Sequence, residues 1–114
     1  MKTNWPEATK ELTTLLGTLR VDTPEVMQAF SGIARSALVS GTLDSKTKEL
    51  IALGIAVAIR CDDCIAFHAR AACGQGASRE EVIETLGMAI YMGAGPSVMY
   101  AAHALEAFNQ FSGK

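Results

Sequence analysis

The residues that start and end helices constrain the fold of this chain more than any other feature. Its three prolines all stand where the first turn of a helix tolerates proline: Pro6, Pro24 and Pro96. Asp44 can cap a further helix, and Ser78 with Glu81 forms an S-x-x-E capping box. Between these starts, apolar residues recur at helical spacing, and no stretch alternates polar and apolar residues with a period of two.

These signals predict an all-α fold, a bundle of about six helices. The expected helices are Pro6–Leu19, Pro24–Val39, Ser45–Ile59, Asp62–Cys73, Arg79–Met92 and Pro96–Phe108. Alanine and glycine are frequent in the later helices, and small side chains let helix axes approach closely. At 114 residues the chain has the size of one domain, so we expect a single domain over residues 1–114.

The overall charge and apolar content narrow the range of partners. A formal net charge of -2 leaves no surplus of Lys and Arg to displace counterions, so we expect no nucleic-acid partner. Hydrophobic residues make up 49% of the chain, and its mean hydropathy of +0.20 is high for so short a soluble protein. We therefore expect the excess apolar surface to be buried between the subunits of a homo-oligomer.

Two apolar stretches could be read as membrane spans. Leu50–Ile59 is too short to cross roughly 30 Å of hydrocarbon, and Thr85–Leu105 is interrupted at Gly93–Ser97. The segment Met1–Pro6 has no apolar run typical of a secretory signal. We therefore expect no membrane partner and a cytoplasmic location.

Cys61, Cys64 and His68 form the strongest local motif, C-x-x-C-x-x-x-H, at the expected start of the fourth helix. Residues three and four apart on a helix are neighbours, so Cys64 and His68 share a face and Cys61 can reach Cys64. The N-terminus of a helix favours thiolate over thiol, and a nearby imidazole can take the proton. The motif therefore predicts an activated dithiol.

Metal binding is the alternative for these residues. The motif offers three ligands including His68, and Cys73 or His103 could be a fourth. We favour redox chemistry without metal, because structural zinc sites usually take a second ligand pair from a distant knuckle that this chain lacks. Otherwise we expect Cys73 to be a buried small hydrophobe and His103 a packed or interface histidine. Glu49, twelve residues before Cys61, would be costly to bury alone and so points to solvent or serves a site.

Glu49, eleven further residues and Cys61-x-x-Cys64-x-x-x-His68 together resemble the signature of the carboxymuconolactone decarboxylase and AhpD-like alkylhydroperoxidase family. The similarity covers about residues 43–108. The resemblance implies an all-α fold assembled as a trimer or a hexamer, and a cysteine-containing branch that reduces hydroperoxides by cycling a dithiol and a disulfide. It also implies that Cys64 is the peroxidatic cysteine and Cys61 the resolving one, with Glu49 and His68 as a proton relay.

We therefore expect an enzyme, a thiol-dependent peroxidase that reduces a hydroperoxide without an organic cofactor. A thiol or disulfide reductant is its implied partner, because each turnover leaves the enzyme oxidised. AhpD-type peroxidases often carry histidine where this chain has Asp63, and a carboxylate there opposes a neighbouring thiolate. Two alternatives remain open. One is a lactone decarboxylase-like enzyme that uses Glu49 and His68 without thiols, and the other is a non-catalytic protein whose assembly is switched by the disulfide.

Overall fold

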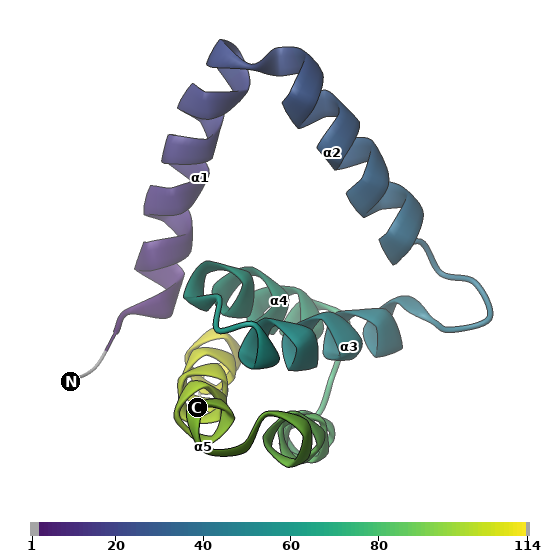
Figure 1. The fold of residues 1–114 in the computed structure, drawn as a ribbon, viewed down its shortest axis with the longest axis vertical. Coiled ribbons are helices and arrows are strands. Elements are labelled where there is room, and N and C mark those ends of the chain that lie inside the picture. The colour runs from purple at the N-terminus through teal and green to yellow at the C-terminus, as the bar shows by residue number, and fades with distance from the viewer. Residues whose placement is uncertain (1–2, 114) are drawn as a thin grey trace.

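The computed structural model describes residues 3–113, which contain helices and no strand. The elements are α1 (Trp5–Asp22), α2 (Pro24–Leu38), α3 (Ser45–Ala58), α4 (Asp62–Gly74) and α5 (Arg79–Ser112). The predicted all-α fold is confirmed, with five helices where about six were expected (Figure 1). Of the predicted domain, Met1, Lys2 and Lys114 lie outside the described residues.

The last two predicted helices form one element, α5, with a break in the middle. Ala94 has φ 57° and ψ -144°, far from helical values, and Pro96 follows with no N–H to donate. Side chains from both halves, including Leu86 and Ala101, line one cavity, so the two halves lie side by side. The break thus allows α5 to fill two positions of the bundle.

The caps predicted at Asp44 and Ser78 form as expected, whereas the side chain of Thr23, a further candidate cap before Pro24, makes no capping hydrogen bond. The side chain of Asp44 accepts the N–H of Thr47 at 2.8 Å. Ser78 and Glu81 form the capping box, and Lys46 lies 2.9 Å from the Glu81 carboxylate. The Ser78 N–H and the Lys46 ammonium hold the pKa of the Glu81 carboxyl below its usual value. This ion pair ties the start of α3 to the start of α5.

Helices α3, α4 and α5 build the core, and α1 and α2 add little to it. Completely buried apolar side chains include Leu53, Val57, Ile65, Ala69, Val82 and Ala104. Helix α1 buries only Trp5 and Thr9, and α2 buries none of its residues. Figure 1 shows α1 and α2 extending from the α3 and α4 pair as two sides of a triangle. Within residues 3–113, no helix is long and apolar enough to cross a membrane.

Candidate functional site

The turn between α3 and α4 determines where Cys61 lies. The N–H of Cys61 donates to the carbonyl of Ala56 at 3.0 Å, and the N–H of Arg60 donates to that of Val57 at 3.2 Å. These two bonds form a Schellman motif, whose left-handed position is usually glycine. Here Arg60 occupies it with φ 62°. The motif ends α3 and places Cys61 directly before the first residue of α4.

Cys61 caps α4 and is joined to Cys64 by a disulfide. Its Sγ accepts the backbone N–H of Cys64 at 3.1 Å, as an N-cap side chain does, and the two Cα atoms are 5.2 Å apart. The sulfur pair therefore lies at the positive end of the α4 macrodipole, where a thiolate is favoured. Both cysteines are partly exposed, so reagents can reach them.

Glu49 of α3 and His68 of α4 form a hydrogen-bonded pair beside the cysteines. Nδ1 of His68 lies 2.7 Å from Oε1 of Glu49, whose residue is only 8% exposed. A carboxylate can only accept, so Nδ1 carries the hydrogen and Nε2 of the neutral ring is left as a proton acceptor. Because His68 lies one helical turn after Cys64, its ring shares a face with that thiol. The pair therefore offers a proton acceptor on the face of α4 that carries Cys64.

The structure thus pairs the four residues singled out by the motif two by two, Cys61 with Cys64 and Glu49 with His68. It also contains a feature that the sequence did not reveal. His103 was expected to be a packed or interface histidine. It does pack against Trp5 and Tyr100, and its Nδ1 also lies 3.0 Å from Oδ1 of Asp62, next to Cys61. The two residues are 41 positions apart, and no spacing signal predicts their contact.

The residues considered as alternative metal ligands lie in different surroundings. Cys73, predicted to be a buried small hydrophobe, packs against the core but is only partly buried. Among the residues that the structure describes, no three His, Cys, Asp or Glu side chains come together as a metal site. Cys61 and Cys64 form a disulfide with each other, and His103 is hydrogen-bonded to Asp62.

Most of this chain matches the model of a known protein family. Residues 24–107 match the model of the carboxymuconolactone decarboxylase family. The chain belongs to this family. The match begins at the first residue of α2, so it extends further toward the N-terminus than the resemblance noted from residue 43 onward.

Solved structures of other carboxymuconolactone decarboxylase family proteins share the fold. The crystal structure of apo-lpg0406 from Legionella pneumophila, described as a member of the family, is 54% identical and has a TM-score of 0.92. The match covers 95% of this chain and 96% of that one. TM1620 from Thermotoga maritima is 32% identical with a TM-score of 0.69, over 73% of this chain and 75% of that one. An uncharacterized protein of Cupriavidus necator is 39% identical over 96% of both chains.

Family membership and the cysteine pair fit the AhpD-like type of carboxymuconolactone decarboxylase family protein. Two features position these residues: the packing of α3 on α4 joins Glu49 to His68, and the Schellman turn leads from α3 to the cysteine pair.

Proposed function

We propose that this protein is an AhpD-like thiol peroxidase that reduces hydroperoxides through a dithiol and disulfide cycle. The observation that carries the proposal is the position of the cysteine pair at a helix N-terminus, where Cys64 lies one turn before a histidine oriented by a buried glutamate. A related protein, TM1620, is described with a suspected role in an antioxidative response, which agrees with this chemistry.

In the first step, the Cys64 thiolate attacks the peroxide O–O bond. The sulfur gains one oxygen and becomes a sulfenic acid, and the other oxygen leaves as alkoxide or hydroxide. His68, which has accepted the Cys64 proton on Nε2, returns it to the leaving oxygen. Glu49 keeps Nδ1 protonated and balances the positive charge that His68 carries between these events.

In the second step, the Cys61 thiolate attacks the Cys64 sulfenic sulfur. A disulfide forms and the oxygen leaves as water once it has gained a proton. The two residues are close enough for this bond without unfolding α4, because the disulfide is compatible with the helix that begins at Asp62. A dithiol reductant then returns the enzyme to its reduced state and is itself oxidised to a disulfide.

The proposal includes a homo-oligomer that works in the cytoplasm. Helix α2 carries an exposed apolar stripe at helical spacing, Val26, Phe30 and Ile33. An apolar groove of about 490 Å³ also lies between α3 and the first half of α5, lined by residues that include Ile55 and Met88. Contact between copies of the chain would remove both surfaces from water.

The test is peroxide consumption with a dithiol reductant. We expect wild-type protein to turn over repeatedly, the Cys64→Ser variant to consume no peroxide, and the Cys61→Ser variant to form one trappable sulfenic acid without turnover. A single oxidation followed by arrest in the wild type would favour the redox-switched assembly protein. Lactone decarboxylation that survives the loss of both cysteines would favour the decarboxylase.

The competing metal interpretation is tested on the same preparation. Reduced protein should contain far less than one zinc ion per chain. Zinc that is retained at one ion per chain through dialysis against a chelator, with unfolding when it is finally removed, would assign the cysteines to a structural site instead.

A further inference from the structure

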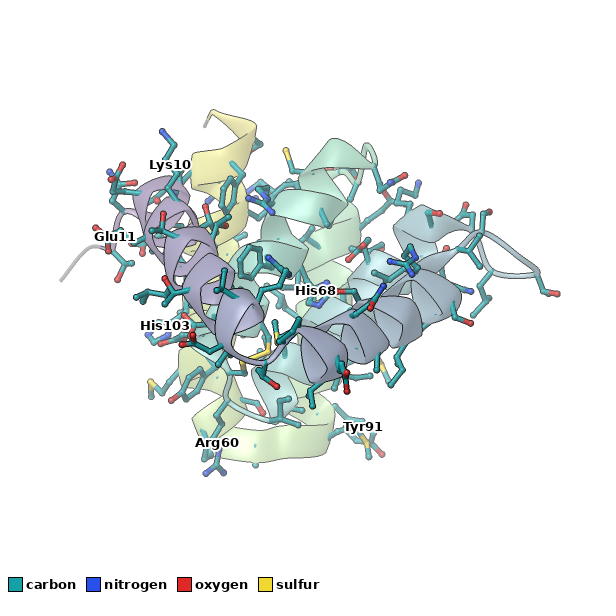
Figure 2. All side chains as sticks on the ribbon, turned by 90° about the horizontal axis from the view of Figure 1, so that it is seen from above. Lys10, Glu11, Arg60, His68, Tyr91 and His103 are labelled. Carbon is teal, nitrogen blue, oxygen red and sulfur yellow. A yellow bond between two sulfur atoms is a disulfide. The ribbon has the colours of Figure 1, made fainter. Side chains whose placement is uncertain are left out.

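A second histidine and carboxylate pair lies at the Cys61 end of the disulfide. Nδ1 of His103, on the second half of α5, donates to Oδ1 of Asp62 at 3.0 Å. Asp62 is the first residue of α4 and directly follows Cys61. Seen from above, the yellow disulfide bond lies between the labelled side chains of His68 and His103 (Figure 2). Each end of the disulfide therefore has its own imidazole and carboxylate pair.

Aromatic packing fixes the position of His103. Its ring centroid lies 6.2 Å from that of Trp5 and 5.2 Å from that of Tyr100. Trp5 is itself buried, and its indole N–H donates to Oε1 of Glu106 at 2.8 Å. A cavity of about 240 Å³ opens beside the imidazole, whose side chain is 43% exposed. His103 is thus held in place and can still exchange a proton with water.

The charges around Cys61 act in opposite directions. The N–H of Cys64 and the N-terminus of α4 favour a Cys61 thiolate. The adjacent carboxylates of Asp62 and Asp63 oppose it by repulsion between like charges. A protonated His103 offsets the charge of Asp62, to which it is bonded. The state of His103 therefore determines the net charge next to Cys61.

We propose that the His103–Asp62 pair controls the reductive half of the cycle by balancing charge at the sulfur that leaves. This rests on the proposed function, in which the Cys61–Cys64 disulfide is the oxidised product. A reductant thiolate attacks Sγ of Cys64, the bond to Cys61 breaks, and the bonding electrons leave on Cys61 as a thiolate. Imidazolium at His103 favours that departure. The reductant's second thiolate then attacks the mixed disulfide and releases the Cys64 thiolate, and the reductant leaves as its own disulfide.

Among the described residues, the titratable groups around His103 are Asp62 from α4 and, on its own helix, Tyr100 and Glu106. Trp5, from α1, adds no charge. A role of the His103–Asp62 pair through its charge can be distinguished from a purely structural role. If the pair were only a structural clamp, removing either partner would break the same hydrogen bond and shift the reduction rate in the same direction. If it acts through charge, the two removals act in opposite directions.

The experiment measures the rate constant for reduction of the Cys61–Cys64 disulfide by dithiothreitol between pH 6 and 9, corrected for ionisation of the reductant. We expect His103→Gln to slow reduction about three- to tenfold at pH 6 and not at pH 9, because only the protonated imidazole carries the charge that offsets Asp62. We expect Asp62→Asn to accelerate reduction by about the same factor at pH 9. Both effects should shrink in 1 M salt, because exposed charges are screened.

Matched controls come from α1, where Lys10→Gln and Glu11→Gln make the same changes of charge on exposed side chains away from the disulfide (Figure 2). We expect neither to change the rate. Effects of both pair variants in the same direction, or a pH dependence that survives in His103→Gln, would overturn the proposal. If His103→Gln lowers the stability of the protein, Asp62→Asn still tests the direction of the expected effect, which is faster reduction of the disulfide. The assay contains no peroxide, so its result does not depend on whether the protein is a peroxidase.

Discussion

His68 donates a 2.7 Å hydrogen bond to Glu49, which is nineteen positions earlier in the chain and almost completely buried. A buried carboxylate without a partner is costly, so this bond accounts for a charged residue within the packed face of α3. It also fixes which nitrogen of His68 carries the hydrogen, and so which nitrogen can accept the proton of Cys64.

The first prediction concerns this pair. We expect His68→Gln and Glu49→Gln to slow sulfenic acid formation in a single turnover by about 10²- to 10⁴-fold, the usual contribution of a positioned acid or base. Sulfenic acid is measured by trapping after rapid mixing with peroxide in the Cys61→Ser background. Glu84→Gln, an exposed change on α5, is the matched control and should keep the wild-type rate. Unchanged rates in both pair variants would remove the relay from the mechanism.

The second prediction concerns Asp63, the exposed residue just before Cys64. Its carboxylate opposes the Cys64 thiolate, so Asp63→Asn and Asp63→His should both speed alkylation of Cys64 near neutral pH. The measurement is the pH dependence of Cys64 alkylation in the Cys61→Ser background, paired with the single-turnover peroxide rate. If Cys61, probed in the Cys64→Ser background, is the faster residue to be alkylated and to form sulfenic acid, the roles of the two cysteines are reversed.

The third prediction concerns the turn that places Cys61. Arg60 has a left-handed backbone, which is unfavourable for a residue with a Cβ and easy for glycine. Arg60→Gly should therefore raise the free energy of unfolding by about 0.5 to 1 kcal/mol, with peroxidase activity retained. Denaturant unfolding at a fixed protein concentration measures this. Arg60→Ala keeps the strained backbone and should not stabilise, and an equal gain in both variants would assign the effect to the lost arginine side chain.

The fourth prediction concerns assembly through α2. Phe30 is 63% exposed at the centre of the apolar stripe, and light scattering at micromolar concentration should give the mass of a trimer or a hexamer. Phe30→Glu places a charge in that stripe and should lower the mass. Gln28→Glu, also exposed on α2, adds the same charge outside the stripe and should not. A stable monomer of the wild-type chain would contradict the proposed assembly.

Much of the fold could be predicted because the starts and ends of helices depend on residues that are close together in the sequence. The Asp44 cap and the Ser78 capping box form as expected, since each depends only on residues three positions apart. The break at Ala94 was anticipated from Gly93–Ser97 as an end and a start. The sequence could not show that the two halves of α5 would lie side by side and line one cavity, because this depends on the backbone angles of the break and on packing.

The sequence alone determined the all-α class, the C-x-x-C motif at a helix start and the shared face of Cys64 and His68, because these follow from short spacings on one helix. Tertiary structure decided the rest of the site. Packing of α3 on α4 brings Glu49 to His68, and packing of α5 near the start of α4 brings His103 to Asp62. These contacts join residues that are 19 and 41 positions apart in the chain. They depend on how helices pack rather than on how each helix forms, and local sequence patterns do not predict helix packing.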